Sequence, residues 1–474
     1  MLGCFFFSFL LCCTFCSLSM TTAYTPSATT PRPLSLTATT GSRSKMASVA
    51  SESTMQQPSA STTSSSETVV RILVLGGNGM MGSDFVCRVR DTLEKKHAGT
   101  YRFEITTFNR GNHYWDSEDR VDNILDKKII CGRKKLKRCG QKVFGSGSKV
   151  FDFVVDFSGY KRKYVKYILD NIQVQKLYIF ISTDSVYEVC KPMTKTPILE
   201  EAAVRPDDRT LRDTLNAADD YGNDKLKCEE YLQAQCASKS NLVNSAQGDS
   251  STKTTLKYLI LRLPDVIGPR DNTDRFFNYF LWLRTHKDSG IPLHLNQTEG
   301  KRLSFVHCST VAAVICESID ITLSGASVDS MGNVKHEIKN QVFNLTDGND
   351  EGIQLKEFLI LMGKAMGIPE VTFKEGACEE INTYYPSTTR GPISSKKAVS
   401  TFSMYRPKNI YDVLKESVMF YDRVMSLWVN NKCNKVIKEQ IEEIVHDDLV
   451  QELEMSKIQR TNFWNSLRRY YACD

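Results

Sequence analysis

Three side chains that together could move a proton lie in two short segments of the chain. Thr183 belongs to the segment Ser182–Tyr187, and Tyr221 and Lys225 are the two ends of YGNDK. Because residues i and i+4 share one face of a helix, the Lys225 ammonium can lie beside the Tyr221 phenol. A neighbouring cation lowers the pKa of a phenol from about 10 towards the range of a general acid/base. We therefore expect Tyr221 to exchange a proton with a substrate oxygen that the Thr183 hydroxyl holds.

Tyr and Lys also occur at this spacing on ordinary exposed helices, so the pair indicates catalysis only together with other motifs. A glycine-rich turn provides it, because Gly76, Gly79 and Gly82 directly follow the apolar run 69–75, which is typical of a strand buried on both faces. Such glycines permit a tight turn, let a pyrophosphate approach the backbone and let the next helix, from Ser83 to about Leu93, pack on the sheet. The pattern predicts dinucleotide binding by Gly76, Gly77, Asn78, Gly79, Met80, Met81 and Gly82.

The end of the second predicted strand, 101–108, bears on the choice of cofactor. It runs into Asn109 and Arg110. An acidic residue there would accept hydrogen bonds from the adenosine ribose and favour NAD, whereas Asn and Arg suit a 2′-phosphate and favour NADP. The alternative is that Arg110 simply faces solvent.

The elements that must position these residues alternate between strands and helices. Further strands are predicted near 128–130 and over 151–157 and 177–181, with a helix over 161–171. This alternation predicts an α/β fold with a Rossmann-type, doubly wound parallel sheet. The strand 151–157 ends at the small residues Ser158 and Gly159, where a cofactor can lie against the backbone, with Phe157 beside it.

Composition and charge narrow the class of protein. The chain has 474 residues, of which 41% are hydrophobic and 24% charged, and this excludes global disorder and a fibrous chain. The net charge of +6 is small for this length and does not predict nucleic-acid binding. A basic cluster at Lys134, Lys135, Lys137 and Arg138 lacks interleaved aromatic residues, so a solvated loop is favoured over an RNA site. The cysteines beyond residue 20 include no CxxC pair and predict reduced, mostly buried thiols.

The N-terminal region has the composition of a leader. Residues 1–20 are uncharged and apolar, as in a signal peptide, and residues 21–68 are rich in Ser, Thr, Ala and Pro and are predicted to be disordered. The two parts resemble the leaders of proteins sent to plastids that are bounded by extra membranes. The alternatives are a secretory signal with a linker, or translation that starts at Met46 and leaves a cytoplasmic protein. No stable membrane anchor is expected in the mature form.

Several motifs together resemble the extended short-chain dehydrogenase/reductase superfamily, in its NAD-dependent epimerase/dehydratase family, from residue 69 to 426. The motifs are LVLGGNGMMG, ISTDSVY, YGNDKLKCEEYL, LRLPDVIGPRD and FNLTDG. The resemblance implies that NADP or NAD binds the N-terminal sheet, with Pro264 among its contacts, and that a nucleotide sugar or similar small substrate binds a smaller C-terminal lobe. It further implies that Tyr221 is the acid/base, Lys225 its pKa tuner and ribose contact, and Thr183 the substrate clamp. The implied substrate contacts are Asp184, Ser185, Arg270 and Arg275. Members of the family often form homodimers, so the resemblance also implies a homodimer.

Four positions depart from the family's pattern. Glu188 replaces the glycine after V-Y, and Ser185 replaces the Glu that dehydratases carry as a base, which weakens a dehydratase interpretation. Gly132 stands where an adenine-binding acid is common, and Arg302 lies one position away from the family's diphosphate-binding arginine.

Two appendages and one rival function complete the predictions. The polar segment 234–254 is predicted to be a surface insertion, and 427–474 an amphipathic helical extension that packs on its own domain or binds a partner. The favoured function is hydride transfer with Tyr acid/base catalysis, and epimerase and reductase chemistry use the same residues. The rival is a non-catalytic RNA-binding or scaffolding protein, similar to plastid stem-loop RNA-binding relatives of this fold. The intact set of Thr183, Tyr221 and Lys225 argues against that rival.

Overall fold

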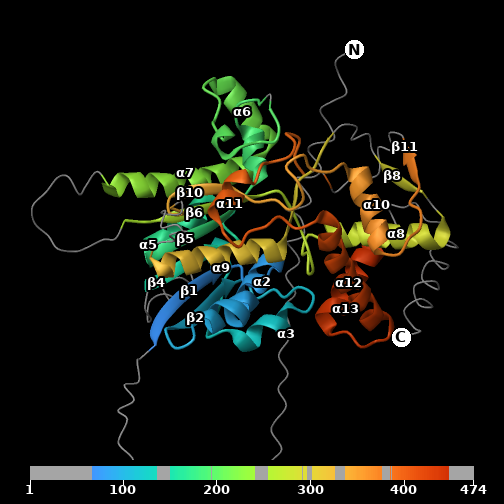
Figure 1. Ribbon diagram of the computed structural model, residues 1–474, viewed down its shortest axis with the longest axis horizontal. Coiled ribbons are helices and arrows are strands. Elements are labelled where there is room, and N and C mark those ends of the chain that lie inside the picture. The colour runs from blue at the N-terminus through green and yellow to red at the C-terminus, as the bar shows by residue number, and fades with distance from the viewer. Residues whose placement is uncertain are drawn as a thin grey trace, which may run out of the picture. The chain divides into compact units, whose positions relative to one another are not determined.

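A parallel sheet forms the centre of the protein. The computed structural model describes residues 67–135, 150–193, 195–240, 255–290, 292–295, 301–325, 337–375, 385 and 387–447. Within them, seven parallel strands pair in the order β10-β6-β5-β4-β1-β2-β3 (Figure 1). Their bounds are β1 Thr68–Leu75, β2 Tyr101–Asn109, β3 Lys127–Ile130, β4 Val150–Asp156, β5 Gln173–Thr183, β6 Tyr258–Leu263 and β10 Gln341–Asn344.

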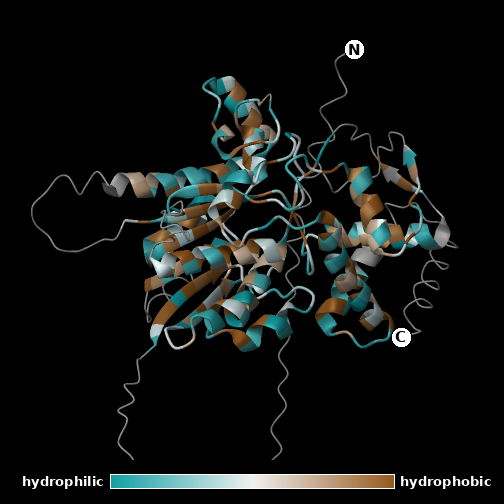
Figure 2. Cartoon of the chain, in the orientation of Figure 1, coloured by the Kyte–Doolittle hydropathy of each residue, from teal (hydrophilic) through white to brown (hydrophobic). Residues whose placement is uncertain are grey.

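Helices cover both faces of this sheet, as its apolar strands require. In β1, Ile72 and Val74 pack with α2 (Met80–Arg88) and α9 (Cys308–Ser324), whereas Leu73 and Leu75 pack with α5 (Arg162–Asn171) and α7 (Asp220–Ser240). Successive residues of a strand point to opposite faces, so a strand covered on both sides must be apolar throughout. Figure 2 shows the resulting hydrophobic colour along β1. The predicted α/β, doubly wound, Rossmann-type fold is confirmed.

The order of the strands creates the place where a ligand can bind. The chain passes from β1 to β2 on one side and from β4 to β5 on the other, so the direction of winding reverses between β1 and β4. In open α/β sheets, ligands bind in the crevice beyond the carboxyl ends of the strands at this reversal. The glycine turn Gly76–Gly82 follows β1, and Ser158 and Gly159 follow β4, so both border that crevice.

A second hydrophobic core lies in the C-terminal lobe. It joins α8 (Arg275–Ser289), α10 (Leu355–Ala365), α12 (Ile410–Val429) and α13 (Lys435–Asp447). Small parallel pairs accompany it, β7 (Asp265–Ile267) with β9 (Phe305–His307) and β8 (Leu293–Leu295) with β11 (Phe373–Glu375). Ile437 and Ile441 of α13 are buried in this core. The predicted amphipathic helix is therefore present in the extension and packs on its own domain.

The remaining helices and helical turns are α3 Ser117–Val121, α6 Arg209–Ala218, α11 Lys396–Thr401, η1 Val89–Glu94, η2 Asp122–Ile124, η3 Arg133–Lys135, η4 Asp184–Val189 and η5 Glu200–Ala202.

Trp115 joins the loop that follows β2 to the C-terminal lobe. Its side chain is fully buried, and its ring centroid lies 5.2 Å from that of Phe277 and 5.3 Å from that of Tyr421. The indole nitrogen donates a hydrogen bond to the Asp271 carbonyl oxygen at 3.0 Å, and the backbone nitrogen donates to Gln440 Oε1 at 3.1 Å. The loop is thus fixed to α8, α12 and α13 at once.

Some predicted segments differ from the structure or lie beyond it. Helix α7 continues to Ser240, into the polar segment 234–254, so the predicted insertion can begin only after that residue. Residues 1–66, 241–254 and 448–474, which include the leader and the end of the extension, lie outside the described residues. None of the helices in the described part of the chain is both long and apolar enough to cross a membrane.

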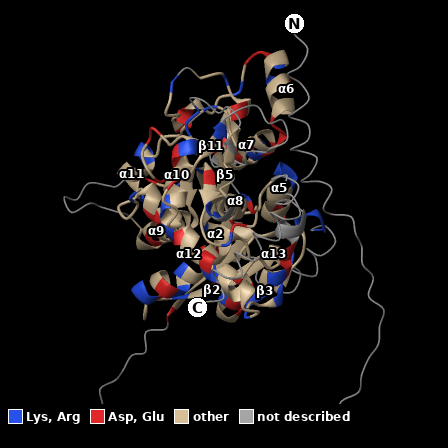
Figure 3. Cartoon of the chain, turned by 90° about the vertical axis from the view of Figure 1, so that its right-hand side faces the viewer, with Lys and Arg blue, Asp and Glu red and all other residues tan. Residues whose placement is uncertain are grey.

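The predicted thiols are mostly as expected, with one correction. Seven described cysteines are free, and four of them, Cys190, Cys228, Cys308 and Cys316, are buried. Cys131 is disulfide-bonded, so the prediction of reduced thiols is wrong there. The reason is that the spacing of cysteines along a chain does not reveal which of them meet in the fold. Figure 3 shows that positions of Lys or Arg and of Asp or Glu are interspersed along the described chain.

Candidate active site

Helix α7 carries the predicted acid/base pair and begins against the end of β5. A Cβ atom at Gly222 would collide with the carbonyl oxygen of Ser185, so only glycine lets the first turn of α7 approach this closely. The Asp219 carboxylate accepts a hydrogen bond from the Gly222 backbone nitrogen at 2.7 Å. An acceptor at this position satisfies one of the free N–H groups at the start of a helix. The glycine of YGNDK therefore sets the distance between Tyr221 and the segment that follows β5.

Lys225 is buried among aromatic rings below Tyr221. Its side chain is 2% exposed, and Nζ donates a hydrogen bond to the Ile181 carbonyl oxygen at 2.8 Å. The ammonium lies 4.9 Å from the ring centroid of Phe180, 5.1 Å from that of Tyr160 and 6.0 Å from that of Tyr221. Burial is the main cause that lowers the pKa of Lys225 to about 8. Lys225 can therefore gain or lose its proton close to neutral pH.

Thr183 and Tyr221 meet through their hydroxyl groups. Tyr221 is 45% exposed, and its hydroxyl is hydrogen-bonded to that of Thr183. Burial raises the pKa of the Tyr221 phenol well above 10, and the nearby Tyr160 and Asp184 add to the effect. The Thr183 hydroxyl also accepts a hydrogen bond from the Ser185 backbone nitrogen at 3.2 Å. The structure thus brings Thr183, Tyr221 and Lys225 together, with the phenol protonated.

A buried ion pair that the sequence reasoning missed holds this arrangement in place. Glu229 lies one turn beyond Lys225, and its carboxylate pairs with Arg262 of β6 at 2.7 Å. The same carboxylate accepts a hydrogen bond from Ser182, the residue before Thr183. The two side chains of the pair are only 4% and 1% exposed. The spacing of Tyr221, Lys225 and Glu229 by four residues each was the available signal, since it places all three on one face of α7.

Carboxyl groups line the site on the side of the C-terminal lobe. Asp184 is 6% exposed, and burial followed by the charge of Asp265 raises its pKa well above the ordinary value. Its Oδ1 accepts a hydrogen bond from the Thr183 hydroxyl at 3.3 Å. Asp265 in turn pairs with Arg275 at 2.6 Å. Burial thus favours the neutral form of the Asp184 carboxyl beside Thr183, while Arg275 compensates the charge of Asp265.

The glycine turn has the open space that a pyrophosphate needs. Gly76 has a φ of +95°, which favours glycine, and a Cβ atom at Gly82 would collide with the Gly76 carbonyl oxygen. A Cβ atom at Gly77 would lie 2.8 Å from Thr107, whereas at Gly79 the nearest atom would be 3.7 Å away. Gly82 and Gly77 thus serve close packing, and Gly79 faces free space. The residues fit a dinucleotide phosphate at this turn.

The amide side chains of the turn and of β2 hold each other. Asn109 Nδ2 donates to Asn78 Oδ1 at 2.9 Å, and Asn109 Oδ1 accepts from the Gly111 backbone nitrogen at 2.8 Å. Asn109 therefore braces the glycine turn in addition to bordering the predicted adenosine site. Arg110 is exposed, and its Nη2 lies 3.3 Å from the Tyr114 hydroxyl. Phe157 and Ser158 lie against Gly76, and Met80, Phe157 and Pro264 are buried.

A second ion pair lies below the predicted adenosine site. Arg133 follows β3 and pairs with the fully buried Asp156 at the end of β4. The Asp156 carboxylate also accepts a hydrogen bond from the Tyr178 hydroxyl at 2.6 Å. Gly132, the position that lacks an acid, adjoins the aliphatic part of Arg110. Of the basic cluster, only Lys134 and Lys135 belong to the described residues.

The predicted substrate arginines separate into two groups. Arg275 borders the site through Asp265, and its guanidinium lies 5.0 Å from the ring centroid of Tyr385. Arg270, in contrast, pairs with Asp116 and lies over the Phe420 ring, so it joins the two lobes near Trp115. Arg302 donates hydrogen bonds to the backbone carbonyls of Glu351 and Gly352. The structure therefore brings Arg275, but not Arg270 or Arg302, into contact with the residues around Thr183.

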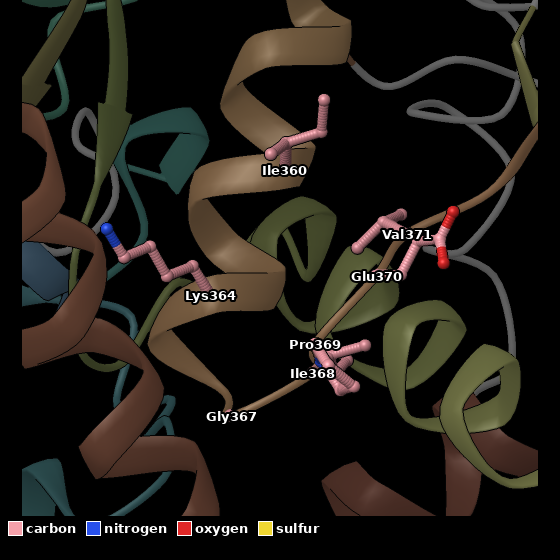
Figure 4. A pocket seen from close by; sticks show the side chains of 7 residues that line it. All are labelled: Ile360, Lys364, Gly367, Ile368, Pro369, Glu370 and Val371. Carbon is pink, nitrogen blue, oxygen red and sulfur yellow. The ribbon is translucent and has the colours of Figure 1, made fainter.

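A hollow on the C-terminal lobe is separate from these residues. It has a volume of about 640 Å³ and is lined by residues from the end of α10 and the chain that follows. Figure 4 shows Ile360 and Lys364 projecting from α10, with Glu370 and Val371 on the adjoining segment. Its lining includes none of the predicted site residues.

Known proteins resemble this chain in structure and not in sequence. Comparisons with models of protein families and with curated protein sequences find no match. Among solved structures, the UDP-glucose 4-epimerase of Thermotoga maritima, in complex with UDP-glucose, matches 75% of this chain and 100% of its own, with 15% identity and a TM-score of 0.51. The UDP-glucose 4-epimerase of Bifidobacterium longum, in complex with NAD+ and UDP, matches 75% of this chain and 98% of its own, with 17% identity and a TM-score of 0.51.

A further match is Pal from Bacillus thuringiensis, with a TM-score of 0.52, 16% identity and coverage of 75% of this chain and 100% of that one. Each of these likenesses covers three quarters of this chain and nearly all of the solved structure. The chain has the fold of the extended short-chain dehydrogenase/reductase superfamily.

Proposed function

We propose that this protein is an NAD(P)-dependent enzyme of the epimerase/dehydratase type that acts on a carbinol or carbonyl carbon of a nucleotide sugar. The observation that carries the proposal is that Thr183, Tyr221 and Lys225 lie together at the carboxyl end of β5, on the edge of the parallel sheet that also carries the glycine turn after β1. A nicotinamide cofactor, bound along Gly76–Gly82 and Ser158, would supply the hydride chemistry. Solved epimerases of similar fold include complexes with UDP-glucose, with NAD and with NAD+ and UDP, which supports the same ligand classes here.

The residues of this chain divide the proton chemistry between them. Thr183 and Tyr221 hold the substrate oxygen between two hydroxyl groups. Tyr221 gives its proton to that oxygen when the carbon is reduced and takes it back when the carbon is oxidised. Its phenol is protonated in the free protein, so proton removal depends on positive charge brought near it, and Lys225 provides such a charge when protonated.

The residues beside Thr183 favour epimerase or reductase chemistry over dehydration. A dehydration needs a base as well as an acid. Ser185 is a buried hydroxyl that lies 3.2 Å from the Thr183 hydroxyl, and burial raises the pKa of the Asp184 carboxyl well above its ordinary value. Glu188, the next carboxylate along the chain, binds backbone nitrogens of another segment. Asp184 can thus supply an acid in this segment. The other carboxylate, Glu188, is already hydrogen-bonded to the backbone nitrogens of Thr389 and Arg390.

Binding of the cofactor is the first test. We expect NAD or NADP to raise the melting temperature of the purified chain, because a ligand that binds only the folded state stabilises it by RT ln(1 + [L]/Kd), about 2.7 kcal/mol at a hundredfold excess. A preference for NADP rests on Arg110, whose guanidinium is exposed, so Arg110→Ala should remove any difference between the two cofactors. No shift with either cofactor would refute the proposed function.

Turnover is the second test. UDP-glucose and UDP-glucuronic acid are incubated with the protein and cofactor, and the products are separated by chromatography. Tyr221→Phe serves as the control, since it keeps the ring and removes the exchangeable proton. Equal product formation by the original protein and this variant would rule out Tyr221 as the acid/base.

A further inference from the structure

A short segment of the C-terminal lobe lies across the end of η4, next to the proposed catalytic residues. We call this segment, Ser387–Arg390, the strap. The Ser387 backbone nitrogen donates to Asp265 Oδ2 at 3.3 Å, and the Thr388 hydroxyl lies 3.4 Å from Asp184 Oδ2. Asp184 in turn contacts Thr183. The strap is therefore separated from the proposed reacting hydroxyls by a single carboxyl group.

Glu188 is the main anchor of the strap. Its Oε1 accepts hydrogen bonds from the backbone nitrogens of Thr389, at 2.7 Å, and Arg390, at 3.0 Å. Its Oε2 accepts one from the Thr389 hydroxyl at 2.7 Å. Hydrogen bonds to an ionised carboxylate are stronger than those between neutral groups, and the Glu188 side chain is only 15% exposed. One side chain thus satisfies three donors of the strap.

The Arg390 side chain of the strap also donates hydrogen bonds to the backbone of η4 and of the residues after it. Its Nη2 donates to the Glu188 carbonyl oxygen at 2.8 Å, and its Nη1 donates to the Lys191 carbonyl oxygen at 3.0 Å. Its Nε lies 3.8 Å from Glu188 Oε2, too far for a hydrogen bond. The strap and η4 are therefore joined by hydrogen bonds in both directions, and most of them involve atoms of Glu188.

The position of this contact indicates what the strap does. Thr388 is half-buried on the side of Asp184, and the Asp265–Arg275 pair lies behind Ser387. A substrate whose reacting oxygen is held by Thr183 and Tyr221 would have its remaining atoms near these groups. Hydroxyl and backbone N–H groups suit a polyhydroxylated ligand, because each can donate to or accept from a sugar hydroxyl.

We propose that the strap forms the substrate-facing wall of the site and that Glu188 is the positioning residue that holds it there. This inference rests on the proposed function and deepens it, since it assigns recognition of the sugar part of the substrate to Ser387 and Thr388. It also gives a role to the carboxylate that stands where the family's pattern has a glycine. The cofactor site at Gly76–Gly82 makes no contact with Glu188 among the interactions of the described residues, so the two should respond separately.

Two variants of Glu188 distinguish the effect of its hydrogen bonds to the strap from the effect of its negative charge. In Glu188→Gln, the amide oxygen can still accept from both backbone nitrogens, and the amide nitrogen can donate to the Thr389 hydroxyl. In Glu188→Ala, all three hydrogen bonds are lost. Glu439→Ala is the matched control, because Glu439 is a 63% exposed carboxylate on α13 that pairs with Lys435.

Hydrogen exchange of the full chain is measured first, on peptides that cover residues 387–393. We expect Glu188→Ala to accelerate exchange of the Thr389 and Arg390 amides at least tenfold, and Glu188→Gln and Glu439→Ala to leave it nearly unchanged. Unchanged exchange in Glu188→Ala would overturn the assignment of Glu188 as the anchor. This readout needs no ligand, so it stands even if the proposed function fails.

Affinity for UDP-glucose is then measured by calorimetry with NAD present at saturation. We expect Glu188→Ala to weaken the binding of UDP-glucose about tenfold, Glu188→Gln to restore most of it, and the affinity for NAD to remain the same in all variants. Faster exchange together with unaltered UDP-glucose affinity would overturn the role of the strap in substrate recognition. Absence of NAD binding by the original protein would instead overturn the proposed function and leave the exchange result intact.

Discussion

Replacement of Lys225 by Met should stabilise the protein, although it removes the cation proposed to lower the pKa of Tyr221. The pKa of Lys225 falls from its ordinary value of 10.5 to about 8 because the side chain is buried. At a pH below 8, Lys225 is protonated in both the folded and unfolded states, and the folded state bears the cost of the buried charge. The difference between the two pKa values corresponds to roughly 3 kcal/mol. Contacts of the ammonium with the rings of Phe180 and Tyr160 offset part of this cost, so we expect a gain of about 1–3 kcal/mol.

The pH dependence gives this prediction a sign that can be checked. Between pH 8 and 10.5 the unfolded chain binds more protons at Lys225 than the folded protein does, so the stability of the original protein rises with pH in that range. The Met variant lacks this contribution. The advantage of Lys225→Met should therefore be full at pH 7, decline through pH 8 to 10.5, and vanish or reverse at pH 10.5, where only the hydrogen bond to Ile181 is lost.

Urea unfolding of both proteins at pH 7, 9 and 10.5 measures these differences. Lys225→Arg is the control, since it keeps a buried cation whose charge cannot be removed in this range. An advantage of the Met variant that does not change with pH would refute the reasoning, because it would show that packing and not the buried charge is responsible. A Met variant that is less stable at pH 7 would show that Lys225 is held as a favourable cation.

Three further predictions concern the proposed site. Tyr221→Phe should keep the fold and the binding of NAD and lower turnover at least a hundredfold, as steady-state kinetics and calorimetry would show; turnover within tenfold of the original would contradict the assigned role. Gly79→Ala and Gly82→Ala should both abolish the thermal shift with NAD, but only Gly82→Ala should lower the melting temperature without ligand, because only its Cβ atom collides with the protein's own backbone. Glu229→Ala should destabilise the protein by about 3–5 kcal/mol in urea unfolding, since it leaves the guanidinium of Arg262 buried without its charge partner; a loss below 1 kcal/mol would show that water reaches Arg262.

Features that depend on residues close together in the sequence could be predicted from the sequence. The apolar run 69–75, the glycines after it and the i, i+4 pair in YGNDK each determine their neighbours directly, so β1, the glycine turn and the Tyr221–Lys225 face of α7 could be predicted. The close approach of α7 to the segment after β5 depends on Gly222, which belongs to the same motif.

Contacts between distant residues could not be predicted in this way. Glu229 and Arg262 are 33 residues apart, and Glu188 and Thr389 are 201 residues apart, so no local pattern joins them. Arg270 and Arg275 look equivalent in the sequence, yet Arg270 follows a loop that turns it towards Asp116, while Arg275 opens α8 and meets Asp265. Only the fold shows which of two neighbouring arginines borders the site.

The burial of Trp115 has a consequence for the energetics of binding. The loop that contains Trp115 begins at the end of β2, next to the predicted adenosine site. Its indole packs in the core of the lobe that carries Asp265, Arg275 and the strap. Movement at one end must therefore displace packed groups at the other, and the two ligands of the proposed enzyme should bind cooperatively. Thermodynamic reciprocity then requires that NAD strengthens the binding of the sugar nucleotide by the same factor as the sugar nucleotide strengthens that of NAD. The indole of Trp115 is a natural fluorescent reporter of that coupling.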